Sequence, residues 1–202
     1  PMGIIELLGL AGSVSLLSGW RLYATILITG LAMRTGGVPL PEQLQVLDVL
    51  ANPWVLGVAG VGAVMEFLAD KVMWLDSIWD AIHSLIRPVG GALLALAIVD
   101  PGDPTWQVVA FLLGGGAAFA AHAGKASARA AVNVSPEPVS NMVVSTTEDV
   151  ATLGLLALAI ANPVAAVVIA AVLLVLSIVL IVVVGRAVRR FFRRTRERPG
   201  AV

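Results

Sequence analysis

The sequence contains no cysteine, only two histidines and few charged side chains. Charged residues make up 13% of the chain, about half the share that is usual in a soluble domain. The absence of cysteine excludes disulfides, thiolate nucleophiles and cysteine-ligated metal centres. What remains is strongly apolar, because 58% of the 202 residues are hydrophobic and the mean hydropathy is +0.94. This composition predicts an integral membrane protein with a single domain.

Six apolar runs, separated by turn residues, are candidates for membrane spans. They lie near 14–33, 54–72, 84–99, 105–125, 143–161 and 163–185. Because backbone polar groups must be satisfied inside a membrane, these runs predict helices. We therefore expect an all-α, polytopic protein with about six transmembrane helices in one domain covering residues 1–185. The first 17 residues are expected to form an interfacial or half-inserted helix that leads into the first span.

Basic residues are concentrated at the C-terminal end. Seven of the thirteen Lys and Arg residues lie in 186–202, which is predicted to be a basic cytoplasmic tail. Cytoplasmic loops carry an excess of Lys and Arg, and six spans return the chain to the side on which it started. We therefore expect a multi-pass protein with both termini in the cytoplasm. The tail is expected to bind anionic lipid, and no nucleic acid.

Two parts of the chain resemble each other. "GALLALAIVDP" (91–101) recurs as "LGLLALAIANP" (153–163), and "GVGAVMEFLADK" (60–71) aligns with "GGGAAFAAHAGK" (114–125). The blocks occur in the same order, which predicts a duplicated helical hairpin with copies near 54–99 and 105–161. Chance similarity between segments rich in Ala, Leu and Gly is the alternative. Transporter folds are often built from such repeats, with the binding site between them.

Several runs are too short to cross a membrane by themselves. Twelve residues precede Glu66 in the second run, and eleven follow Pro88 in the third, whereas a span needs about 20. The neighbouring polar residues are therefore predicted to enter the cytoplasmic half of the membrane. A charge that faces lipid costs roughly several kcal/mol there, so these side chains should face each other or water. Segments 73–87 and 133–145 are either re-entrant or amphipathic and cytoplasmic.

The polar residues recur at helical spacing, so that they share single faces. One face consists of Asp76, Asp80, His83 and Arg87, and a milder stripe in the first run consists of Ser18, Arg21, Thr25 and Thr29. Such faces predict a polar cavity at the hairpin interface. The residues predicted to line this pathway are Glu66, Asp70, Lys71, Asp76, Asp80, His83, Arg87, His122, Lys125, Arg129, Asn133, Asn141, Ser145, Glu148 and Asp149. The alternative is that paired charges only fix helix packing.

The residue types allow several kinds of chemistry. No nucleophile–base–acid triad is identifiable, so neither an enzyme nor a cofactor is predicted. Carboxylates suit hard cations and histidine suits softer ones, although the spacing matches no standard metal signature. The metal-ligand candidates are Glu66, Asp70, Asp80, His83 and Glu148. A proton relay through His83 is a further hypothesis. Phosphate or anionic-lipid binding would use Arg21, Arg87, Lys125 and Arg129.

Two polar blocks carry a resemblance to a known family. "EFLADK…DSIWDAIHSLIRPVGGALLA", followed by "HAGKASARAAVNVSPEPVSN…STTEDVA", is similar to the DUF4126 bacterial membrane proteins, a domain of unknown function. The resemblance covers nearly the whole chain. It implies a small polytopic protein of the bacterial inner (cytoplasmic) membrane, without an assigned activity. A fainter similarity joins "EFLADK" to the Glu-x-Gly-Asp-Lys-Thr motif of small cation exchangers, although Gly and Thr are missing here.

The combination predicts a small secondary transporter or exchanger, for a cation or coupled to protons. The alternative function is a membrane scaffold or an anionic-lipid- or phosphate-binding protein without transport activity. The expected partners are the lipid bilayer, anionic lipids at the basic tail, and a small ion or solute. The sequence leaves a homo-oligomer open.

Overall fold

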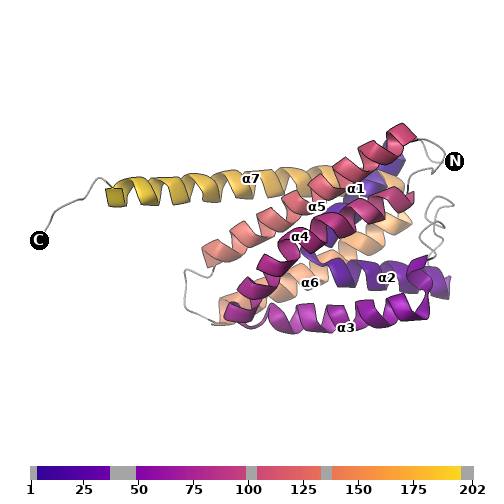
Figure 1. Ribbon diagram of the computed structural model, residues 1–202, viewed down its shortest axis with the longest axis horizontal. Coiled ribbons are helices and arrows are strands. Elements are labelled where there is room, and N and C mark those ends of the chain that lie inside the picture. The colour runs from indigo at the N-terminus through magenta and orange to yellow at the C-terminus, as the bar shows by residue number, and fades with distance from the viewer. Residues whose placement is uncertain (1–3, 37–48, 99–103, 133–137, 197–202) are drawn as a thin grey trace, which may run out of the picture.

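A computed structural model describes residues 4–36, 49–98, 104–132 and 138–196 of the chain. Within these ranges the protein consists of seven α-helices and has no strand, which confirms the all-α prediction (Figure 1). The helices are α1 (Ile4–Trp20), α2 (Leu22–Thr35), α3 (Pro53–Ala69), α4 (Met73–Ile98), α5 (Pro104–Val132), α6 (Pro138–Ala161) and α7 (Pro163–Arg196).

Four helices, α4 to α7, are long and apolar enough to cross a membrane, which supports the predicted membrane protein. The other three are shorter apolar helices, with 17 residues in α1, 14 in α2 and 17 in α3. The prediction of six spans is therefore not confirmed. The first predicted span, 14–33, is divided between α1 and α2, and the second corresponds to the short helix α3.

Arg21 divides the first predicted span. Its backbone is extended (φ −141°, ψ 83°), and it separates the last residue of α1 from the first residue of α2. Figure 1 shows the two helices meeting in a V, so that α2 runs back toward the end of the bundle at which α1 begins. Neither glycine nor proline marks the break, since Trp20 and Leu22 flank it. The Arg21 side chain instead enters a buried network of charges that is described below.

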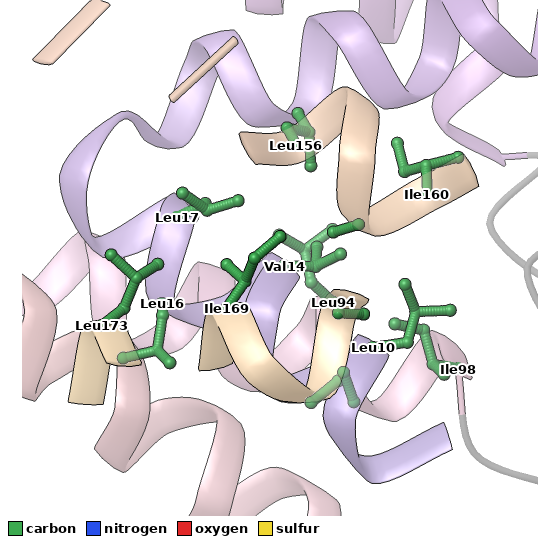
Figure 2. Close-up of a cluster of buried hydrophobic side chains, with 14 of the residues drawn as sticks. Leu10, Val14, Leu16, Leu17, Leu94, Ile98, Leu156, Ile160, Ile169 and Leu173 are labelled. Atoms are coloured by element: carbon green, nitrogen blue, oxygen red, sulfur yellow. The ribbon is translucent and has the colours of Figure 1, made fainter. Parts of the chain in front are cut away.

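Helix α1 is the central helix of the bundle. It contacts α4, α5 and α7, and nearly every residue in 9–19 is buried. Figure 2 shows Leu10, Val14 and Leu17 of α1 among apolar side chains from the other helices. The apolar side chains of α1 thus pack against protein on several sides, and the expectation of an interfacial or half-inserted helix stays a prediction.

The two ends of the described chain lie at opposite ends of the bundle. Gly9 of α1 packs on Val167 in the first turns of α7, so the beginnings of these two helices are neighbours. Helix α7 then continues for 34 residues, roughly 50 Å, to Arg196. The V at Arg21 adds one reversal of the chain to those expected from six spans, and the prediction that both termini lie in the cytoplasm stays a prediction. The basic residues up to Arg196 extend α7 and do not form a separate tail.

The predicted duplication of a hairpin is not confirmed. Its two copies correspond to α3–α4 and α5–α6, but α3 has 17 residues and α5 has 29. The aligned glycines also differ in surroundings. A Cβ on Gly60 would meet nothing within 4 Å, whereas a Cβ on Gly114 would lie 2.4 Å from Ala95 Cβ. Segment 73–87 continues without a break through Pro88 into the rest of α4, and 133–137 lies outside the described residues.

Close packing of α4 against α5 predicts a large effect of one substitution. Gly114→Ala would place a methyl group 2.4 Å from Ala95 Cβ and 2.7 Å from the Gly91 carbonyl oxygen. We expect a loss of about 1–3 kcal/mol in stability, as is typical of overpacking. The matched control is Gly116→Ala, since that Cβ meets nothing within 4 Å. Thermal unfolding in detergent should show a lower Tm for the first variant only; equal Tm values would contradict the described packing.

The reversal at Arg21 predicts the labelling pattern of single cysteines, which the cysteine-free chain makes easy to read. Ile5, Thr35 and Arg193 are exposed. In intact vesicles, a membrane-impermeant maleimide should label Ile5→Cys and Thr35→Cys from the same side, and Arg193→Cys from the opposite side. If Ile5→Cys were labelled from the same side as Arg193→Cys, the reversal at Arg21 would be refuted and the first apolar segment would be one uninterrupted span.

Candidate functional site

Eleven charged residues lie in the interior as two groups held by ion pairs, eight residues around Asp70 and three around Arg87, and we call the two groups together the charged network. Its cations are Arg21, Lys71, Arg87, Lys125 and Arg129, and its carboxylates are Glu66, Asp70, Asp76, Asp80, Glu148 and Asp149. They come from α3, α4, α5, α6, the α3–α4 connection and the apex of the α1–α2 V. Five cations face six carboxylates, so the network carries one net negative charge when nearby imidazoles are neutral.

Asp70, which follows the last residue of α3, is the centre of one half of the network. Its Oδ2 atom lies 3.1 Å from Lys125 Nζ and 3.2 Å from Arg129 Nη2, and it also pairs with Arg21. The side chains of all four residues are at most 2% exposed. Three cations around one carboxylate favour its ionised form, which makes Asp70 a fixed anion.

Helix α6 supplies two further carboxylates to this half. Glu148 Oε2 accepts a hydrogen bond of 2.9 Å from Arg129, while Asp149 pairs with Arg21 at 2.9 Å and with Lys71 at 3.2 Å. Ser145, one turn earlier on α6, accepts a hydrogen bond from Lys71 through its hydroxyl. The carboxylates are 14% and 22% exposed, so α6 forms the less buried side of the network.

Arg87 is the centre of the other half and is fully buried. It donates to Glu66 Oε1 at 2.8 Å and to Asp80 Oδ1 at 3.0 Å. Its Nη1 atom also lies 2.6 Å from His122 Nδ1. Because a guanidinium only donates, His122 Nδ1 must accept, which makes His122 a neutral imidazole with its hydrogen on Nε2. That nitrogen lies 3.1 Å from the hydroxyl of Ser84, which can accept the hydrogen.

His83 lies one helical turn before Arg87 and is 3% exposed. Its ring stacks on Trp79, with 4.3 Å between the ring centroids, and meets Tyr23 of α2 edge-on. The Nδ1 atom lies 2.8 Å from the Trp79 carbonyl oxygen, and Nε2 lies 3.1 Å from the Tyr23 hydroxyl. His83 therefore connects α4 to the first turn of α2.

The structure brings together thirteen of the fifteen residues predicted to line the pathway. Asn133 lies outside the described residues, and Asn141 lies in α6 with a side chain that the structure does not describe. The predicted interior is occupied by ion pairs in this conformation. A separate apolar pocket of about 310 Å³ lies between α2 and α3, lined by Tyr23, Ile26, Trp54, Val55, Val58 and Ala59.

The hypothesis of a metal site stays a prediction. No group of three His, Asp or Glu side chains is placed there to hold a metal ion. The candidates were Glu66, Asp70, Asp80, His83 and Glu148. The four carboxylates are paired with Arg or Lys, and His83 bonds to Trp79 and Tyr23. In this conformation the candidate side chains are thus engaged with other groups of the protein.

Two residues of the site, Tyr23 and Ser84, were not predicted, and Arg21 was predicted only as part of a polar stripe and as a candidate for anion binding. Arg21 contacts Asp70, Glu148 and Asp149 and is only 2% exposed. A single arginine in the middle of an apolar run is a signal for an interior site, because such a charge is costly in lipid. Tyr23 and Ser84 give no comparable signal, since their roles depend on the histidines beside them in space.

Comparison with known proteins gives one match. A family model described as "Domain of unknown function (DUF4126)" matches residues 8–183, which include all seven helices in whole or in part. No curated protein and no solved structure matches the chain.

The central position of Asp70 predicts a large loss of stability when its charge is removed. Asp70→Asn leaves Arg21, Lys125 and Arg129 with too few anions, and breaking a buried pair in this way costs about 3–5 kcal/mol. Asp149→Asn is the control, because Asp149 is 22% exposed and water can replace part of its contacts. Thermal unfolding in detergent should show a much larger decrease in Tm for Asp70→Asn. Equal decreases in Tm would contradict the central position of Asp70.

Proposed function

The chain belongs to the DUF4126 family, whose description gives no activity, and we propose that it is a small secondary transporter or exchanger for a cation, coupled to protons. The charged network is the observation that supports this proposal. Ionisable residues inside a membrane are costly and commonly mark ion pathways. Among the described residues, six carboxylates face five cations, so the carboxylates of the network outnumber its cations by one.

The excess carboxylate leaves room for a bound cation or proton. Glu66 is 1% exposed and Asp76 is 2% exposed. Glu66 Oε2 and Asp76 Oδ1 have no hydrogen-bond partner among the described residues. Buried carboxylate oxygens are costly unless they are paired, so both are acceptors that a proton or a small cation would satisfy. The network is thus suited to exchange one positive charge.

The depth of the network also supports transport. Gly124, next to Lys125, packs on Ser177 of α7. Ser177 is 14 residues after Pro163, roughly 21 Å along the helix, while the apolar core of a bilayer is about 30 Å thick. Discontinuous helices that meet inside the membrane form the binding sites of many secondary transporters. The V of α1 and α2, with Arg21 at its apex, is a break of this kind.

We also propose an orientation in the cytoplasmic membrane. The end of the bundle that holds Lys71 and the C-terminal arginines of α7 is the more basic end. The excess of Lys and Arg favours the cytoplasmic side for this end. Helix α1 then begins on the opposite side of the membrane.

Binding of anionic lipid without transport is the second candidate function. One observation favours it: Arg186, Arg189 and Arg190 are exposed on the part of α7 that extends beyond the rest of the bundle (Figure 1). Exposed arginines near the membrane surface attract acidic headgroups. This surface lies outside the charged network, so the two functions are separable by mutation.

Flux in proteoliposomes tests the proposed transport. The purified protein is reconstituted, and uptake of Na⁺ or K⁺ is measured with and without a pH gradient. Asp80→Asn and Glu148→Gln should reduce the flux to that of empty vesicles, because each changes one carboxylate of the network. The control Arg190→Gln, on the exposed part of α7, should retain the flux.

No flux of either cation or of protons by the wild type would refute transport. Weaker binding of Arg190→Gln to vesicles with acidic lipid would then favour the second candidate.

A further inference from the structure

The hydrogen bonds of His83 leave it able to accept a proton. The Trp79 carbonyl oxygen, 2.8 Å from Nδ1, can only accept, so Nδ1 carries a hydrogen. The Tyr23 hydroxyl, 3.1 Å from Nε2, can either donate or accept. When His83 is neutral, Tyr23 donates to Nε2. When a proton binds to Nε2, the hydroxyl rotates and accepts it, so neither hydrogen bond of His83 is lost.

His122 has the opposite arrangement. Its Nδ1 atom accepts a hydrogen bond of 2.6 Å from Arg87, which can only donate. A proton on this nitrogen would break that bond and place an imidazolium against a guanidinium. The two histidines of the chain therefore differ in one respect that matters for proton binding: His83 can gain a proton within its present contacts, and His122 cannot.

Charges of both signs act on His83: burial and Arg87 oppose a positive charge on its ring, whereas Glu66 and Asp80 favour it. The groups that act on it electrostatically are Glu66 on α3 and Asp80 and Arg87 on α4 itself. From α2 its neighbour is Tyr23, while His122 of α5 contacts Arg87. Two carboxylates and one guanidinium leave this half of the network with one net negative charge. An imidazolium at His83 would neutralise it without any change in the other ion pairs.

We propose that His83 is the proton-binding site of the charged network, and that the Tyr23 hydroxyl changes from donor to acceptor when the proton binds. The proton goes to His83 Nε2 and leaves from the same atom. This inference rests on the proposed transport function and names the proton as its coupling ion. Tyr23 is a positioning residue, and Gly62 of α3 leaves the space that its ring occupies, because a Cβ there would lie 2.4 Å from Tyr23 Cδ1.

Nuclear magnetic resonance of the full chain, labelled with ¹⁵N-histidine in lipid nanodiscs, tests the proposal without any need for transport. The chain has two histidines, and His122→Gln assigns their signals. Between about pH 5 and 8, His83 should change from the Nδ1–H tautomer to the doubly protonated form, while His122 stays an Nε2–H imidazole. Tyr23→Phe and Gly62→Ala should move the transition of His83 to lower pH, because Nε2–H loses its acceptor. A His83 that stays neutral throughout, or a His122 that titrates instead, would overturn the proposal.

Measurements of cation flux distinguish the proton site at His83 from the proposed transport function. His83→Gln should abolish the dependence of cation flux on pH, whereas the control Arg190→Gln, on the exposed part of α7, should retain it. If the wild type transports cations and His83→Gln leaves the pH dependence unchanged, the proton site is refuted and transport stands. If the wild type transports nothing while His83 titrates as described, transport is refuted and the proton site stands.

Discussion

Buried charges need partners of opposite charge, and the rest of the structure depends on this requirement. An arginine in the interior of a membrane protein is tolerated only when anions and hydrogen-bond acceptors surround it. Arg21 meets this need through Asp70, Glu148 and Asp149, which come from the end of α3 and from α6. The chain interrupts its first apolar segment at Arg21, and the V of α1 and α2 places the guanidinium at the centre of the bundle.

Small residues allow the helices to approach closely enough for these ion pairs to form. Gly19 of α1 lies against the backbone of α5, and Gly91 of α4 lies against Gly114 of α5. The hydroxyl of Ser15 also donates to the carbonyl oxygen of Gly91 at 2.9 Å. Because lipid tails are as apolar as leucine, close packing and interhelical hydrogen bonds hold membrane helices together. The glycines of the core thus allow α1, α4 and α5, which hold part of the charged network, to approach one another closely.

The charged network has two halves with different properties. Around Asp70, four cations face four carboxylates, and most of these side chains have several partners, although Asp76 pairs only with Arg129 among the described residues. Such an arrangement favours a rigid structure with fixed charges. Around Arg87, two carboxylates share one guanidinium, and one oxygen of Glu66 lacks a partner among the described residues. The second half is therefore the part of the network that can gain a positive charge at little structural cost.

The sequence by itself determined the class of protein and the identity of most of the interior charges. Hydropathy predicted apolar membrane helices, and the spacing of Asp76, Asp80, His83 and Arg87 predicted one polar face, because both are local properties of a helix. Thirteen of the fifteen predicted pathway residues do lie together. Only the tertiary structure decided where the first apolar segment breaks, at Arg21, and in which direction α2 then runs. It also decided that the two ends of the described chain lie at opposite ends of the bundle, and which carboxylate pairs with which cation. These features depend on contacts between residues far apart in sequence. Arg21 breaks a helix without glycine or proline because its partners, Asp70 and Asp149, come from helices that hydropathy alone cannot position.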